Sequence, residues 1–328
     1  MADYRIEKYD PSLREEWDDF VLNRSVNGTF LQTKNFLDYH PEGRFTDDSL
    51  MVYQKGRLIA VCPACVLQNG ASEEFFSHKG STFGGPVIKS DYYTAERVTH
   101  IIKTLDAYLE TKYSKATFKI TPGLFSKDSD SLLQYCMEYC GYTGYSELNT
   151  YIDLQSLPED IIDAFDRNKL RNIRKCMEHN LSFREIRDRE ELAGFHDLLT
   201  VNLSKYGVTP IHTLDDICDF AYSRIPGNVK FYGVFDGNIM RAAGMMFVFG
   251  NDVIHAQNLS ADYTFEDYSA ITYLYYKVID DAKKSGFKKL TWGVSTENQG
   301  KTLNFGLIRN KESYGSKHAV NKTYYKEF

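Results

Sequence analysis

Four basic residues stand close together in a chain that is acidic overall. Arg167, Arg171 and Arg174 recur at helical spacing, so they share one face of a helix, and Lys175 lies beside that face. Guanidinium groups bind phosphate oxygens in pairs, so this face is a candidate site for the phosphates of a transfer RNA, a nucleotide-linked sugar or coenzyme A. A solvated helix face would show the same spacing, and the residues alone leave both interpretations open.

A polar strand carries the second group of candidates. Over residues 253–259 the alternation of a strand predicts His255 and Gln257 on one face and Asn258 on the other. His255 is a candidate proton acceptor, and the two amides are candidate hydrogen-bond partners of a substrate. A structural histidine with satisfied hydrogen bonds is the alternative interpretation.

More candidates follow towards the end of the chain. Lys311, with Lys301 and Arg309 nearby, could hold a phosphate or stabilise charge on a leaving group. Trp292 and Glu297 bracket the end of a predicted strand, and Glu297 could accept the proton of an amine. Ordinary surface lysines and a loop acid are the alternatives.

Single residues elsewhere complete the set of candidates. His78 lies in the glycine-rich stretch 75–88 and could bind substrate, although a hydrogen bond that organises the loop would explain it equally. Tyr232 and Tyr268 are candidate cleft aromatics, with core packing as the alternative. Ser269 stands where a helix is expected to begin, and helix N-termini attract anions.

Several kinds of chemistry find no support in the sequence. It has no Gly-x-Ser-x-Gly elbow and no phosphate-binding Walker motif. Of the six cysteines, Cys62 and Cys65 have C-x-x-C spacing but fall in a strand-like run, and Cys136 and Cys140 lie one helical turn apart. Without a histidine cluster or a second C-x-x-C pair, no metal is expected, and the cysteines are interpreted as small buried hydrophobes.

The elements that must position these residues form an α/β pattern with mixed sheets. A hairpin with a Lys-Gly turn at residues 49–66 recurs with an Asp-Gly turn at 230–247, and a strand, a helix and a strand follow each hairpin. This repeat predicts two similar domains, residues 1–148 and 149–328. A helix is expected from Pro158 through the basic stretch, and a glycine-punctuated tail from Ser295 to a last strand rich in tyrosine.

The composition is that of a globular protein with two domains. The chain has 328 residues, 42% hydrophobic and 26% charged, with a formal net charge of −6. Such a charge excludes a general nucleic-acid coat, so phosphate binding must be local. The N-terminus has no apolar h-region and no apolar run reaches the ~18 residues of a membrane span, so a cytoplasmic protein is expected.

Three motifs carry a resemblance to a known family. They are Ser-His-Lys-Gly-Ser-Thr-Phe-Gly-Gly-Pro at residues 77–86, Arg-Asn-Lys-Leu-Arg-Asn-Ile-Arg-Lys at 167–175, and Gly-Leu-Ile-Arg-Asn-Lys-Glu-Ser-Tyr-Gly at 306–315. With these motifs the chain resembles the Fem-like branch of the GNAT superfamily. That branch includes the aminoacyltransferases of peptidoglycan cross-bridges in the cell wall and acyltransferases found with polysaccharide-biosynthesis genes.

The resemblance implies two tandem GNAT-like domains and transfer of an acyl or aminoacyl group to an amine. The donor would be acyl-CoA or aminoacyl-tRNA, the acceptor a small-molecule or nucleotide-linked sugar precursor of the envelope or a polysaccharide, and Lys311 would lie near the substrate phosphates or the reaction. Residues 262–270 depart from the family pattern, because they hold three acids and no glycine where a pyrophosphate is usually bound. A catalytically silent protein that binds an envelope precursor or a partner enzyme is therefore the alternative.

Overall fold

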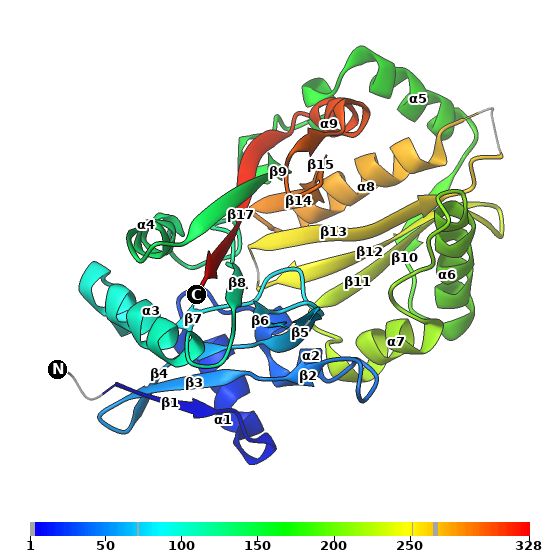
Figure 1. The fold of residues 1–328 in the computed structure, drawn as a ribbon. Helices are drawn as coiled ribbons and strands as arrows, with labels where there is room; N and C mark the ends of the chain where they lie inside the picture. The colour runs from blue at the N-terminus through cyan, green and yellow to red at the C-terminus, as the bar shows by residue number, and fades with distance from the viewer. Residues whose placement is uncertain (1–3, 71, 251, 265–267) are drawn as a thin grey trace. The chain divides into compact units, whose positions relative to one another are not determined.

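The fold was analysed in a computed structural model that describes residues 4–70, 72–250, 252–264 and 268–328 (Figure 1). The chain forms two compact units. The first holds residues 1–147 and 320–328, and the second holds residues 148–319. The last residues of the chain, which the sequence-based boundary assigns to the second domain, thus belong to the first unit. No helix in the described ranges is long and apolar enough to cross a membrane.

The first unit has two sheets with helices packed against them. One sheet has the order β1-β3-β4-β7, and strands of this unit in the other follow the order β17-β8-β6-β5-β2. Its strands are β1 (Tyr4–Lys8), β2 (Thr46–Asp47), β3 (Leu50–Gln54), β4 (Arg57–Cys62), β5 (Cys65–Asn69), β6 (Ser72–Ser77), β7 (Val87–Ile88), β8 (Lys115–Lys119) and the end of β17 (Lys317–Glu327). Its helices are α1 (Arg14–Asp19), α2 (Lys34–Leu37), α3 (Ala95–Leu109) and α4 (Ser131–Tyr139).

The second unit is built on strands in the order β10-β11-β12-β13-β14-β9. These strands are β9 (Thr143–Asp153), β10 (Ser182–Glu185), β11 (Val229–Asp236), β12 (Ile239–Phe249), β13 (Val253–Ala261) and β14 (Lys289–Val294). The helices are α5 (Arg167–Glu178), α6 (Arg189–Ser204), α7 (Leu214–Asp219), α8 (Ala270–Lys284) and α9 (Phe305–Glu312), and a small ribbon joins β15 (Thr296–Glu297) to β16 (Thr302–Leu303). Only β13 and β14 pair in parallel among these six strands.

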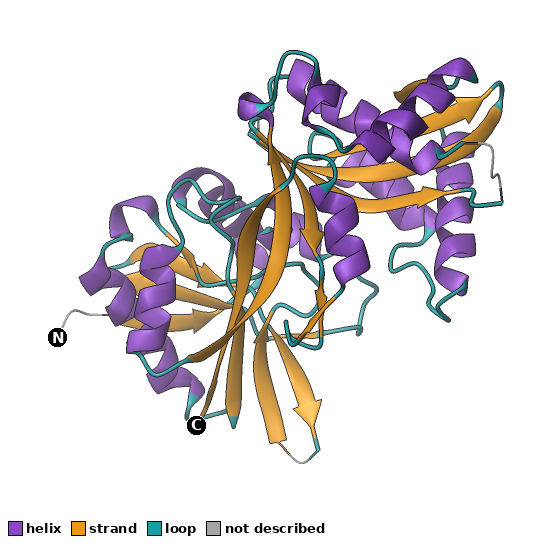
Figure 2. Cartoon of the chain, turned by 90° about the horizontal axis from the view of Figure 1, so that it is seen from above, coloured by secondary structure: helices purple, strands orange, loops and turns teal. Residues whose placement is uncertain are grey.

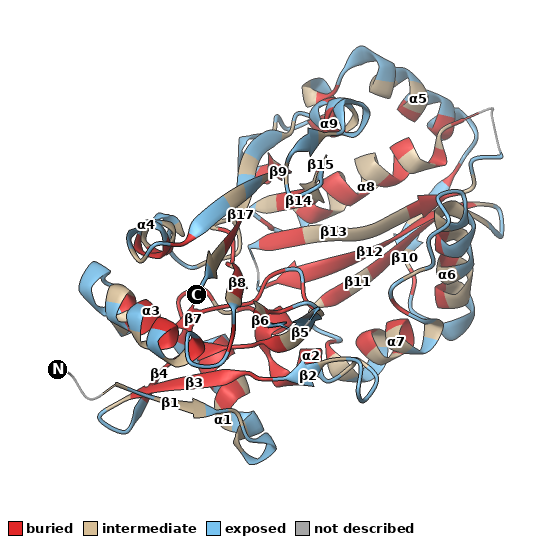
Figure 3. Cartoon of the chain, viewed as in Figure 1, coloured by how far each residue is buried: buried red, intermediate tan, exposed pale blue. Residues whose placement is uncertain are grey.

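Helices cover both faces of the second unit's strands (Figure 2). On one face α8 buries Leu274 and Val278 against Ile254 and Leu290 of the sheet. On the other face α6 packs on β12 and β13, with the ring of Phe195 lying 5.9 Å from that of Phe231 in β11. The burial pattern in Figure 3 follows this arrangement, because β11 and β12 are buried along most of their length while α5 and α6 keep exposed outer faces, and the middle of β13 is half-buried.

A repeat of helix geometry supports the duplication. Both α1 and α7 continue into a π-helical turn, Phe20–Arg24 in the first unit and Phe220–Arg224 in the second. In each, the arginine at the end donates from Nε to the aspartate before the phenylalanine, Arg24 to Asp19 and Arg224 to Asp219. The units also share a hairpin and a parallel pair of strands joined by a helix, β6-α3-β8 and β13-α8-β14. The predicted duplication of pattern thus extends to the helices.

One local prediction is wrong, and one helix was not predicted. The helix expected from Pro158 begins only at Arg167, because Phe165 is extended and packs its ring 5.3 Å from that of Tyr314 in the core. The glycine-punctuated tail contains the helix α9, whose first turn is capped by Asn304 through a 3.0 Å bond from the Leu307 amide.

Candidate active site

The parallel strands β13 and β14 part within the sheet of the second unit. Their register pairs three residues of each strand and ends with His255 opposite Thr291. Further along, the described residues of β13 pair only with β12. We call this point the strand fork. Parting strands expose backbone groups that would otherwise bond across the ladder, so the fork offers hydrogen bonds to an extended ligand.

A β-bulge changes which side chains of β13 share a face. The register with β12 shifts so that Ala256 faces Met246 and Asn258 faces Met245, which leaves Gln257 as the extra residue. The predicted face shared by His255 and Gln257 is confirmed, because their side chains are hydrogen-bonded. The prediction that Asn258 lies on the opposite face is wrong, because the bulge returns it to the side of His255. Strict alternation in the sequence gives no sign of such a bulge.

His255 lies half-buried over a glycine at the strand fork. An ideal Cβ on Gly293 would stand 3.3 Å from the histidine Cε1, and Gly293 has a positive φ of 70°, so the close approach and the backbone both favour glycine. Burial, with the nearby charge of Lys311, lowers the pKa of His255 to about 4. The imidazole is therefore neutral near pH 7 and can accept a proton or a hydrogen bond.

Lys311 reaches the strand fork from α9. Its Nζ donates to the carbonyl oxygens of Gly293 at 3.0 Å and Val294 at 2.9 Å. The side chain is buried, and burial lowers its pKa to about 8. An ammonium group has three N–H donors, so one donor remains after these two bonds. The structure thus brings His255 and Lys311 together around one glycine.

Buried hydroxyl and amide groups that the sequence did not single out surround this pair. Thr291 donates from Oγ1 to Asn149 Oδ1 at 3.0 Å and accepts from the amide of Gly293 at 3.3 Å. Among the described residues, the buried hydroxyls of Thr150 and Ser295 have no hydrogen-bond partner. Unmet buried polar groups call for a water or a ligand atom. No spacing links Asn149 to Thr291 in the sequence, since only the pairing of β9 with β14 joins them.

Comparison with known proteins identifies a domain that includes His255 and Gly293. Residues 164–299 match the sequence family described as acetyltransferase (GNAT) domain. The second unit contains a GNAT domain. A search of curated protein sequences finds no match.

Solved structures extend the likeness to the whole chain. A FemX crystal structure aligns with a TM-score of 0.68 at 12% identity, over 97% of this chain and 96% of FemX. L-PGS from Bacillus licheniformis aligns with a TM-score of 0.60 at 12% identity, over 96% and 91% of the two chains. A tandem GNAT protein of the clavulanic acid pathway gives 0.55 at 10% identity, over 99% and 98%. These identities show the fold alone, and they confirm the predicted Fem-like fold of two tandem GNAT-like domains.

Other predicted site residues of the GNAT domain pack in the domain core, form hydrogen bonds with neighbouring residues or are exposed. Trp292 packs 4.7 Å from the Tyr275 ring and donates from Nε1 to Ser316. Tyr232 is buried and donates to Asp281 at 2.6 Å. Glu297 is exposed on β15. The remaining two predicted residues also have local partners: Tyr268 donates to Asp236 at 3.0 Å, and the Ser269 hydroxyl pairs with that of Thr272 at 2.8 Å.

The predicted basic face is present but separate from Lys311. Four exposed side chains of α5 line a hollow of about 570 Å³, together with Leu170 and Glu178. These four are Arg167, Arg171, Arg174 and Lys175. Lys311 is not among the lining residues, so the structure does not bring the arginines and this lysine to one groove. Lys169 is the α5 residue that contacts α9, through a 2.6 Å bond to Asn310.

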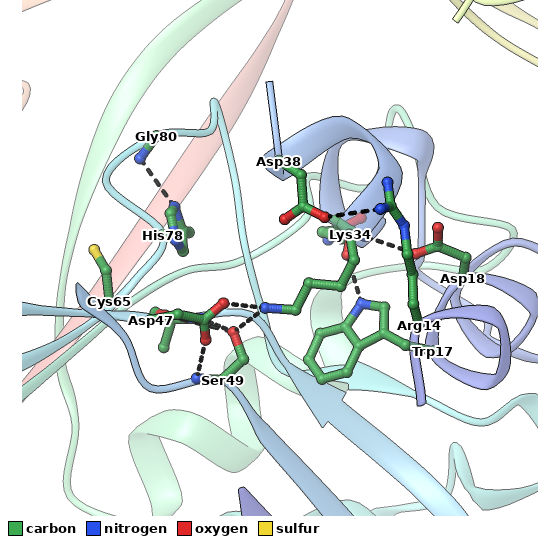
Figure 4. Close-up of polar contacts among 12 residues, drawn as sticks. Arg14, Trp17, Asp18, Lys34, Asp38, Asp47, Ser49, Cys65, His78 and Gly80 are labelled. Atoms are coloured by element: carbon green, nitrogen blue, oxygen red, sulfur yellow. Dashed lines mark hydrogen bonds and ion pairs between the residues drawn. The ribbon is translucent and has the colours of Figure 1, made fainter. Parts of the chain in front are cut away.

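His78 lies one residue beyond the end of the corresponding parallel pairing in the first unit. The parallel pairing of β6 with β8 ends at Ser77, immediately before it. Its Nδ1 accepts from the Gly80 amide at 3.0 Å, and burial lowers its pKa to about 4 (Figure 4). In this unit the chain itself fills the space beyond the last residue pair of β6 and β8, because the backbone amide of Gly84 donates to the carbonyl oxygen of Lys119 at 2.7 Å. The loop-organising interpretation of His78 therefore agrees with its contacts.

A buried lysine near His78 was missed by the sequence reading. Lys34 pairs with Asp47 and donates to the Ser49 hydroxyl at 2.9 Å, and its Nζ lies 4.1 Å from the centroid of the Tyr9 ring (Figure 4). These contacts satisfy the charge and tie α2 to the strands. A lysine in the first turn of a short helix gives no sequence signal of burial.

Proposed function

We propose that this protein transfers an acyl or aminoacyl group to the amino group of a cell-envelope or polysaccharide precursor. The observation that carries the proposal is the pair of His255 and Lys311 at the strand fork of the GNAT domain. A neutral imidazole and a partly neutralised ammonium share Gly293 there, beside strand edges that part. Such a site can align an extended donor and exchange protons without a covalent intermediate.

In the proposed reaction the amine nitrogen attacks the acyl carbonyl carbon. A C–N bond forms, and the bond from that carbon to the leaving sulfur or oxygen breaks. His255 accepts the proton that the amine loses and returns it to the leaving group as a thiol or hydroxyl. Lys311 donates two of its three N–H groups to backbone carbonyls. The third N–H stabilises the oxyanion or the leaving group.

The donor is proposed to be acyl-CoA or aminoacyl-tRNA, and the match to an acetyltransferase family favours the former. Both donors carry phosphates. The exposed arginines of α5 are the proposed contacts for phosphate groups, because guanidinium forks suit them and only Glu178 opposes their charge in that hollow. A nucleotide-linked amino sugar as acceptor would present the same chemistry.

The test is transfer by the purified protein. Acetyl-CoA, longer acyl-CoAs and aminoacyl-tRNA are each incubated with amino-sugar acceptors, and products are read by mass spectrometry. Removing one polar contact of the transition state typically costs about 100-fold in rate, so His255→Gln and Lys311→Met should each lose at least that factor. Glu297→Gln, at an exposed position, serves as the matched control. Transfer that survives both substitutions would refute the proposed site.

A second candidate is a catalytically silent protein that binds an envelope precursor or a partner enzyme. The sequence from Asp262 to Ala270 favours it, because three acids and no glycine occupy the segment before α8. Calorimetry with acetyl-CoA and with a nucleotide-linked amino sugar distinguishes the candidates. Binding of the sugar without any donor, together with no transfer, would favour the silent protein.

A further inference from the structure

A second hollow in the GNAT domain lies apart from the strand fork. It has a volume of about 370 Å³ and is formed by one face of α6 and the segment where β13 ends. The lining residues from Gly194 to the helix C-cap Lys205 span twelve positions, which is about 16 Å along the helix axis. The lining residues are Gly194, Asp197, Leu198, Val201, Asn202, Lys205, Met240, Ala261, Asp262, Tyr263 and Thr264.

One end of this α6 pocket is aliphatic apart from the exposed Asp197, and a glycine keeps it open. Leu198, Val201 and Met240 supply aliphatic side chains to its wall. An ideal Cβ on Gly194 would stand 3.5 Å from Met240 Cε, in ordinary contact. A methyl group would therefore fit at this position, whereas a longer side chain would fill the pocket.

The other end of the α6 pocket is polar and positively charged. The Nζ of Lys205 lies 4.9 Å from the centroid of the Tyr263 ring. Asp262 at this end is already paired with Arg241 at 2.9 Å. Asp197 lies eight residues before Lys205 on α6, about 12 Å away along the helix. An anionic group is thus favoured at Lys205 and disfavoured at the Asp197 end.

A row of polar side chains connects this end to the strand fork. Ser260 faces α6, since Asn202 bonds to its hydroxyl, and the register with β12 places Asn258 and His255 on the same face. Six residues separate His255 from Ala261, which is about 20 Å of strand. A substrate that spans both places must therefore be extended and polar in its middle part.

An exposed aromatic residue lies beside the α6 pocket. Tyr206 is 80% exposed and lies close enough to Tyr263 to raise the pKa of its hydroxyl. An exposed ring beside a pocket suits a ligand that is itself partly apolar.

We propose that the α6 pocket binds the hydrocarbon chain of an amphiphilic substrate whose anionic group lies at Lys205. The reacting end of that substrate would extend along β13 to the strand fork, and this part rests on the proposed function. Binding of the chain does not depend on it. A simple fatty acyl donor fits poorly, because its chain would have to lie along Asn258 and Ser260 instead of in the apolar end.

The experiment measures chain-length dependence by calorimetry with dodecyl phosphate, hexyl phosphate and inorganic phosphate, below micelle-forming concentrations. Burial of each methylene favours binding, so dodecyl phosphate should bind the intact protein at least about tenfold more tightly than hexyl phosphate. Gly194→Leu should weaken the binding of dodecyl phosphate by about tenfold or more, because the leucine side chain fills the apolar end. Lys205→Glu should weaken the binding of both alkyl phosphates.

Thr200→Leu is the matched control, since it adds the same side chain to an exposed position of α6 outside the pocket. Leucine is a better helix former than glycine, so Gly194→Leu is expected to fold. Equal affinity for the two chain lengths, or wild-type binding by Gly194→Leu, would overturn the proposal. His255→Gln should bind dodecyl phosphate with the affinity of the wild type. Failure of the proposed transfer reaction and failure of the proposed pocket are therefore separate results.

Discussion

At the scale of single residues, the two titratable groups of the strand fork are perturbed in the same direction for the same reason. Burial disfavours the charged form of both His255 and Lys311, and the charge of Lys311 further disfavours a charged His255. Near neutral pH, Lys311 is therefore mostly protonated and His255 is neutral. That distribution suits an acceptor imidazole beside a donor ammonium.

The charge of Lys311 predicts an alkaline limit to activity. With a pKa of about 8, the side chain loses its proton as the pH rises through 8, and kcat should then fall by about tenfold per pH unit. Lys311→Arg keeps its charge at these pH values, so any activity that it retains should lack this fall. The measurement is kcat against pH for both proteins with saturating substrates. An identical alkaline fall in the arginine variant would assign it to another group.

Two histidines with lowered pKa values predict proton uptake on unfolding. The pKa of His255 and of His78 is about 4 in the folded protein, whereas the ordinary pKa of histidine is 6.5. Between these values the unfolded chain binds protons that the folded one does not, so stability falls as the pH drops from 6.5 to 4. At pH 5.2 each histidine should take up about 0.9 proton on unfolding. His255→Gln and His78→Gln should each lower the measured uptake by that amount.

At the scale of elements, much of the fold follows from local pattern. The Lys-Gly and Asp-Gly turns lie at residues of positive φ, Gly56 and Gly237, and the predicted hairpins form around them. The strand, helix and strand before residue 295 are likewise predicted within a few residues. What failed depended on tertiary contacts: the bulge at Gln257 is set by pairing with β12, and α9 is hidden by glycines on either side.

The helix α9 predicts a positioning role for its cap. Asn304 accepts from the Leu307 amide, and Lys311 lies two turns further along. Asn304→Ala should lower the free energy of unfolding by about 1 kcal/mol and lower kcat, because Lys311 is held less firmly. Asn304→Asp restores a side-chain cap and should restore both values. Thermal unfolding and steady-state kinetics check this, and an alanine variant with full kcat would show that the cap does not position Lys311.

At the scale of the whole molecule, the chain completes its first unit with its last residues. Thr323 to Glu327 of β17 pair with β8, and residues 320–328 cluster with the first unit. The sequence places this segment some 200 residues after the first hydrophobic core, and no local pattern reveals such a return. A boundary drawn between two halves of the sequence therefore does not separate two independent units.

This return predicts that one substitution near the C-terminus destabilises the first unit. Tyr324 is fully buried in the core with Phe118 and Leu133, and its hydroxyl donates to Glu138 at 2.9 Å. Tyr324→Ala should lower the free energy of unfolding by about 3 kcal/mol, because it leaves a cavity and an unpaired carboxylate. Tyr325→Ala, a half-buried neighbour on the same strand, should cost about 1 kcal/mol or less. Hydrogen exchange locates the effect, since faster exchange in α3 and β8 is expected for Tyr324→Ala alone, and unchanged protection there would mean that β17 does not complete this core.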